Sequence, residues 1–181
     1  MNFLKYSFIA LLSIVLIGSA GYLLASSGIE SKPGYAKLTM PSWFLTDTKI
    51  AINLGPKGLK PVRWMINHIV HDHELELSEQ LLLSMLQDLQ GVQLRVYEVE
   101  NDRQIFDQAI DESVATLKQK DWQTILRVRE DDEHVVIMKS GNDDSISGIS
   151  VLASTPENAV FINLMGHIDP ESIATIATSW N

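Results

Sequence analysis

The chain has 181 residues, of which 45% are hydrophobic and 20% are charged, and its formal net charge is -9 at pH 7. This length suits one globular domain with an appended segment, and the acidic balance disfavours nucleic-acid binding, which depends on clustered Lys and Arg. The absence of cysteine excludes disulfides, thiolate metal sites, a cysteine nucleophile and a lipid-modified N-terminal cysteine.

An almost wholly apolar stretch at residues 8–25 follows Lys5 near the start of the chain. Its length lies between the apolar region of a signal peptide and a transmembrane helix, which needs about 20 apolar residues. Gly18 and Ala20 are small residues that favour cleavage, whereas residues 22–24 continue the apolar run. We therefore interpret residues 1–25 as a signal peptide or a transmembrane anchor, and expect an exported protein that is periplasmic or anchored in the inner membrane facing the periplasm.

The next segment, residues 26–47, contains Pro33, Gly34, Pro41 and Ser42 and has no sustained hydrophobic period. Such a composition is typical of a linker. We therefore place a single folded domain at residues 48–181.

Hydrophobic periodicity predicts the elements of this domain in chain order. Alternation indicates strands at residues 48–54, 92–97, 122–129, 135–139, 146–153 and 159–165. Apolar residues at helical spacing indicate helices at residues 62–70, 77–89, 105–117 and 170–180.

The four strands between residues 122 and 165 follow one another through short turns. These linkers are too short for crossover helices, so the strands should form an antiparallel meander. Helices segregated from a mostly antiparallel sheet are typical of an α+β fold. We predict a two-layer sandwich in which helices cover the purely apolar face of the sheet.

Several strand sequences are similar to an uncharacterised bacterial family, domain of unknown function 4252. The similarity lies in the stretches at residues 91–98, 122–130, 149–152 and above all 160–171, and the pattern extends over residues 48–177. The resemblance implies an exported or lipid-anchored envelope protein without an assigned activity. Since many relatives have a lipobox cysteine that this chain lacks, lipid anchoring is not carried over. No catalytic residue is implied either.

The candidates for a metal site are His68, His71 and His73, which flank Asp72 in an acidic stretch. On a helix, His68 and His71 share one face, as a divalent cation requires. The stretch has no H-E-x-x-H signature, and its acidic residues favour a solvated hinge over a metal site. We therefore predict no metal and no cofactor.

The second face of the sheet, opposite the purely apolar one, has an unusual composition for an acidic protein. Arginine and aromatic residues, which are enriched at protein interfaces, alternate along its strands. The candidate binding residues on this face are Arg95, Tyr97, Arg127, Arg129, Phe161 and Asn163, and Ile125 and Met165 share the face. A solvated face with cross-strand ion pairs is the alternative.

Two functions follow from these patterns. The first is a non-enzymatic envelope module that binds a protein partner, or itself, through the open sheet face, with membrane contact through residues 1–25 if these are not cleaved. The alternative is a hydrolytic or metal-dependent periplasmic enzyme that uses His68, His71 and His73. The sequence contains no G-x-S-x-G, G-x-G-x-x-G or P-loop motif, which favours the binding module over an enzyme.

Overall fold

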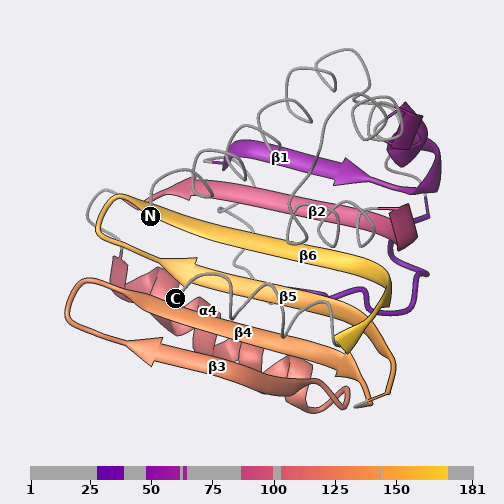
Figure 1. The fold of residues 1–181 in the computed structure, drawn as a ribbon. Helices are drawn as coiled ribbons and strands as arrows, with labels where there is room; N and C mark the ends of the chain where they lie inside the picture. The colour runs from indigo at the N-terminus through magenta and orange to yellow at the C-terminus, as the bar shows by residue number, and fades with distance from the viewer. Residues whose placement is uncertain are drawn as a thin grey trace, which may run out of the picture.

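Six antiparallel strands form one curved sheet with the order β1-β2-β6-β5-β4-β3 (Figure 1). The structure is a computed structural model that describes residues 28–38, 48–61, 63–64, 87–99, 103–142 and 144–170. The strands are β1 (Thr48–Leu54), β2 (Leu89–Glu98), β3 (Gln123–Arg129), β4 (His134–Gly141), β5 (Ile146–Ser154) and β6 (Asn158–Ile168), with helix α4 (Arg103–Lys118) between β2 and β3. A short helical stretch also follows β1 at residues 56–61.

The strands β3, β4, β5 and β6 form the predicted antiparallel meander, and β2 pairs with the far side of β6. Both the α+β class and the mostly antiparallel sheet are confirmed. The connections β3–β4, β4–β5 and β5–β6 are tight turns; in the first, Glu130 N–H donates to the carbonyl of Glu133 over 2.7 Å. These turns fix the register of neighbouring strands and therefore which side chains share a face.

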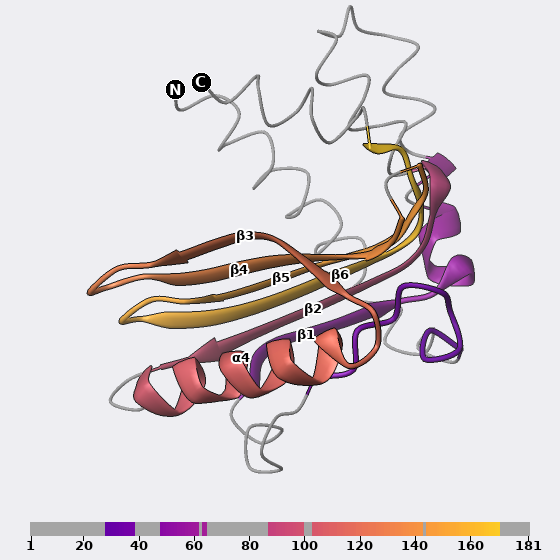
Figure 2. The ribbon, with the colours of Figure 1, turned by 90° about the horizontal axis from the view of Figure 1, so that it is seen from below.

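Helix α4 packs against one face of the sheet, which we call the helix face (Figure 2). Its buried side chains recur at helical spacing and form an apolar stripe with Ser113: Phe106, Ala109, Ile110, Ser113, Val114 and Leu117. This stripe packs on buried side chains of the central strands: Tyr97, Val136, Met138, Leu152, Ala159 and Phe161.

The chain leaves α4 through a tight turn that contains Asp121. Asp121 has φ 62°, the left-handed conformation that commonly ends a helix, and Trp122 N–H donates to the carbonyl of Leu117 over 3.2 Å. Trp122 and Leu117 are both buried in the cluster under α4. This turn sends the chain directly into β3 at the margin of the sheet.

Residues 28–38, which we call the strap, lie on the helix face beside the C-terminal end of α4 (Figure 2). Ala36 N–H donates to Asn163 Oδ1 over 2.9 Å, and Asn163 Nδ2 donates to the carbonyls of Gly34 (2.9 Å) and Ile149 (3.2 Å). A Cβ on Gly148 would lie 2.5 Å from Gly34 Cα, so only glycine permits this approach. The described part of the predicted linker, residues 28–38, is therefore packed on the sheet.

The opposite face of the sheet is apolar as well. Its side chains form a second cluster around Leu54, Leu89, Ile146, Ile149 and Ile168, with partly buried Ile52, Val92, Ile137, Val151 and Leu164 packed against it. The helices predicted at residues 62–70, 77–89 and 170–180 fall largely outside the described residues, as do the apolar segment 8–25 and the rest of the predicted linker. Within the described ranges, no helix is long and apolar enough to cross a membrane.

Candidate functional site

The predicted binding face is the face on which α4 and the strap lie. Tyr97, Phe161 and Asn163 are only 2%, 1% and 0% exposed, respectively. Tyr97 contacts Phe106 of α4, with ring centroids 5.8 Å apart, and Asn163 is hydrogen-bonded to the strap. The prediction that these three residues form an open surface is wrong, because their aromatic rings and amide instead meet the apolar stripe of α4 and the backbone of the strap.

Arg95 lies on the same face and is half-buried. Its Nη1 donates to the carbonyl of Leu94 over 3.3 Å. Burial and the nearby Glu30 raise the pKa of the Tyr35 phenol above its ordinary value of 10.0, and the positive charge of Arg95 partly opposes that rise. Arg95 therefore belongs to the environment of the strap and not to a free surface.

Arg127 and Arg129 occupy a different position, at the margin of the sheet on β3. Arg127 Nη2 lies 2.7 Å from Asp111 Oδ1, and Arg129 Nη1 lies 3.2 Å from Asp111 Oδ2. Both arginine side chains stay accessible, at 44% and 57% exposure. Two guanidinium groups thus share one carboxylate of α4.

The strand β3 is the edge of the sheet, and within the described part of the chain it pairs with β4 alone. Six of its seven residues are exposed and Val128 is half-buried. The other edge strand, β1, is less accessible, since Ile50, Ile52 and Asn53 are half-buried and Leu54 is buried. An exposed edge presents unpaired backbone N–H and C=O groups that another strand can pair with.

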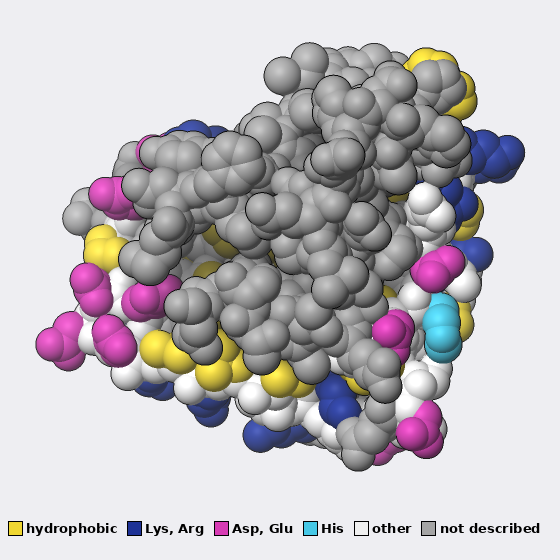
Figure 3. All heavy atoms as spheres, viewed as in Figure 1, with side chains coloured by type: hydrophobic (Ala, Val, Ile, Leu, Met, Phe, Trp, Pro, Cys, Tyr) yellow, Lys and Arg dark blue, Asp and Glu magenta, His cyan; other side chains and the backbone are white. Residues whose placement is uncertain are grey.

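A bulge gives β3 two adjacent apolar side chains. Thr124 pairs with Met138 and Leu126 with Ile137, so Ile125 is an extra residue in the strand. Ile125 and Leu126 are 49% and 45% exposed, among the few large hydrophobic side chains in the described residues that reach solvent. Figure 3 shows hydrophobic side chains next to Lys and Arg side chains along the margin where β3 lies. We call Ile125, Leu126, Arg127, Val128 and Arg129 the β3 edge.

A polar cluster lies behind the β3 edge, between α4 and the sheet. His134 is fully buried, with Nδ1 3.5 Å from Asp107 Oδ1 and Nε2 3.8 Å from Asp111 Oδ1, and neither ring nitrogen has a hydrogen-bond partner. Ser154 Oγ donates to Asp107 and not to His134. The cluster thus lacks the nucleophile–base hydrogen bond of a serine hydrolase. Asp111 lies at the exposed margin of this cluster, where its short contacts are to the two arginines of the β3 edge.

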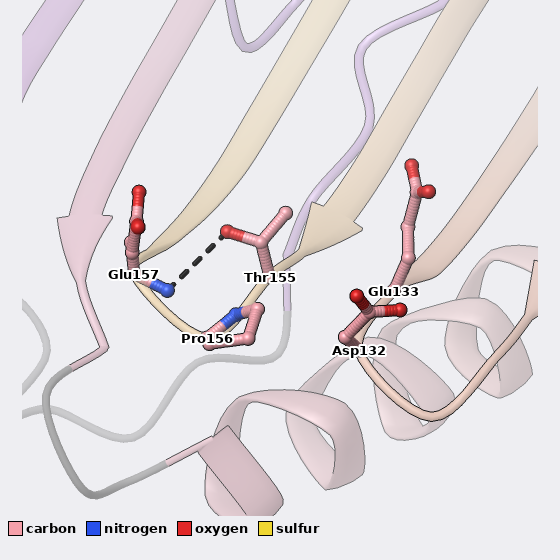
Figure 4. A pocket seen from close by; sticks show the side chains of 5 residues that line it. All are labelled: Asp132, Glu133, Thr155, Pro156 and Glu157. Atoms are coloured by element: carbon pink, nitrogen blue, oxygen red, sulfur yellow. Dashed lines mark hydrogen bonds between the residues drawn. The ribbon is translucent and has the colours of Figure 1, made fainter.

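A shallow hollow of about 410 Å³ lies at the end of the sheet, between the β3–β4 and β5–β6 turns (Figure 4). Asp132, Glu133, Thr155, Pro156 and Glu157 line it. The Thr155 hydroxyl is occupied by the turn, since it accepts from Glu157 N–H (3.4 Å) and Asn158 N–H (3.1 Å). The hollow is therefore an acidic surface that lacks a free nucleophile, and Figure 3 shows acidic side chains at this end.

The metal-site candidates His68, His71 and His73 lie outside the described residues. Within the ranges that the structure describes, no group of three or more His, Cys, Asp or Glu side chains has a geometry that could hold a metal ion. The part of the chain available for a site is thus the β3 edge, its supporting cluster and the acidic hollow.

Leu126 is a functional candidate that the sequence pattern does not identify, and Ile125 is one that the pattern places on the second face without selecting it as a binding residue. The alternation of β3 was read without the bulge, which placed Ile125 among the residues of the second face.

A family model described as Domain of unknown function (DUF4252) matches residues 60–176, which is more than half of the chain. Neither the curated proteins nor the solved structures contain a match.

Proposed function

We propose that this chain, which belongs to the family of the domain of unknown function DUF4252, is a non-enzymatic protein-binding module. In this proposal, a strand of the partner pairs with the β3 edge. The observation behind the proposal is the exposure of six of the seven residues of β3 at the margin of the sheet. Strand addition to an exposed edge is a recurring mode of peptide recognition, in which main-chain hydrogen bonds give affinity and alternate side chains give specificity.

The sheet supports this role because, among the described strands, β3 pairs with β4 alone and its outer side has no strand beside it. The meander holds β3 on one side through β4, and Asp111 of α4 holds the arginines on the helix face. A preorganised edge loses little conformational freedom on binding. We also propose that the fold is a two-layer sandwich, in which α4 is one layer and the sheet is the other.

Two measurements, peptide selection and sedimentation, distinguish self-association from binding to another protein. We expect the purified full-length protein to select peptides from a displayed random library, and to sediment as a single species at concentrations where those peptides bind. The double substitution Ile125→Lys, Leu126→Lys places charge on the edge, a device by which natural proteins block strand pairing. It is expected to weaken binding of the selected peptides by about tenfold or more.

The matched control is Ile105→Lys on α4, because Ile105 is another exposed isoleucine, at 38%. It should leave peptide binding unchanged. Equal loss in both variants, or no loss in the β3 variant with its fold intact, would refute binding at the β3 edge. Concentration-dependent sedimentation that Ile125→Lys, Leu126→Lys abolishes would instead show that the partner is a second copy.

The proposed location is the cell envelope, reached through residues 8–25. Fractionation of tagged full-length protein, followed by N-terminal sequencing, tests this. We expect recovery from the periplasm with a start at Gly21, which indicates cleavage, or from the membrane fraction with Met1 intact, which indicates an anchor. Recovery from the cytosol would contradict export.

A further inference from the structure

We infer that the strand recognised by the β3 edge is an extended segment in which acidic residues alternate with apolar ones; this inference rests on the proposed strand addition. The two faces of β3 have different chemistry. Arg127 pairs with Val136 and Arg129 with His134, which places both arginines on the helix face. Leu126 and Val128 pair with Ile137 and Val135 and lie on the opposite face. A paired strand alternates its side chains in the same way.

The helix face of the edge calls for carboxylates. Arg127 and Arg129 share Asp111 as their one described carboxylate partner, and each keeps about half of its side chain accessible. Guanidinium groups form strong, geometrically specific hydrogen bonds with carboxylates. Directly opposed charges of opposite sign stabilise cross-strand pairs, and like charges destabilise them. A partner strand therefore gains most from Asp or Glu opposite Arg127 and Arg129.

The opposite face of the edge calls for apolar side chains. Ile125 and Leu126 are exposed side by side at the bulge, and Val128 is half-buried beside them. Apolar residues of a partner strand on this face would remove them from water. The acidic β3–β4 turn, residues 130–133, follows directly. It confines the favourable acidic positions of the partner to those opposite Arg127 and Arg129.

A second copy of the same strand does not meet this requirement. Suppose that the β3 strands of two copies pair antiparallel about a two-fold axis, with both α4 helices on the same side of the joined sheet. The numbers of any two directly opposed residues then add up to the same value. If the axis passes through residue 127, 128 or 129, the opposed pairs on the helix face include Arg127 with Arg127, Arg127 with Arg129, or Arg129 with Arg129. Each register brings like charges together, which disfavours self-pairing.

The test uses three blocked heptapeptides in which valine alternates with glutamate, glutamine or lysine, and measures their binding to the full-length protein by fluorescence anisotropy. We expect the glutamate peptide to bind about three- to tenfold more tightly than the glutamine peptide, and the lysine peptide to bind most weakly. Raising the salt concentration should reduce the glutamate preference, because exposed charge pairs are screened.

The variant Arg127→Gln, Arg129→Gln shows whether the arginines cause this order. It should bind the glutamate and glutamine peptides equally while still binding both. Equal affinity of the three peptides for the wild type, or an unchanged preference in the variant, would overturn the acidic partner and leave strand addition standing. Failure of all three peptides to bind, together with failure of library-selected peptides, would overturn the proposed function itself.

Discussion

Replacing Phe161 by alanine is expected to destabilise the protein by about 3–5 kcal/mol, the range for Phe→Ala in a packed core. Phe161 is 1% exposed and packs in the cluster that α4 forms with the central strands. Its removal deletes apolar contacts and leaves a cavity that the surrounding strands and helix cannot fully close. Chemical denaturation followed by circular dichroism measures the change in the free energy of unfolding.

The exposed Leu126 provides the control, since Leu126→Ala removes a large apolar side chain that is 45% exposed. The expected cost of Leu126→Ala is below about 1 kcal/mol, as for most surface substitutions. If Phe161→Ala lowers the free energy of unfolding no more than Leu126→Ala does, Phe161 is not buried under α4. The face that contains Phe161 would then be open, as the sequence pattern predicts.

Replacing Asn163 by leucine should release the strap from the sheet and lower stability by about 2–4 kcal/mol. The Asn163 amide accepts from Ala36 N–H and donates to the carbonyls of Gly34 and Ile149. Leucine has a similar volume but no polar atoms, so these backbone groups lose their partner, and each buried unsatisfied group costs about 1–3 kcal/mol. Amide hydrogen exchange at Ala36 should accelerate more than exchange in the central strands.

Asn158→Leu at the start of β6 is the matched substitution. The described hydrogen bonds of Asn158 run through its backbone N–H and carbonyl, so the change should affect Ala36 exchange little. Unchanged exchange at Ala36 in Asn163→Leu would contradict the role of Asn163 in holding the strap.

The sequence predicts the strands of this protein well because their periodicity and turns are local signals. The alternation of β1 and β2 and the short turns of the meander are each decided within about ten residues. The sequence predicts helix α4 equally well, because Phe106, Ile110, Val114 and Leu117 recur at helical spacing. The order of β1 and β2 beside β6 depends on long-range pairing and could not be read locally.

The choice of face for α4 was predicted wrongly for an identifiable reason. Arg95, Tyr97, Arg127 and Arg129 made one face look polar, but the same face receives Val136 and Met138 from β4 and Leu152 from β5. β4 contains an uninterrupted apolar run from Val135 to Met138, which is typical of a strand buried on both faces. Such a run indicates that both faces of β4 are apolar, so a polar binding surface is better sought at the edges of the sheet.

The bulge in β3 was also beyond the sequence pattern. An extra residue shifts every later side chain to the other face, and the register is fixed only by pairing with β4. The exposed pair Ile125 and Leu126 therefore becomes visible only when Thr124 and Leu126 are assigned to Met138 and Ile137.

The most direct test of strand addition is amide hydrogen exchange of the full-length protein with and without the bound glutamate–valine peptide. Pairing of the peptide with the β3 edge predicts slower exchange at amides within residues 126–129, with β1 unchanged. Protection of β1 alone, or unchanged exchange throughout β3 while the peptide is bound, would contradict the assignment of the β3 edge as the binding site.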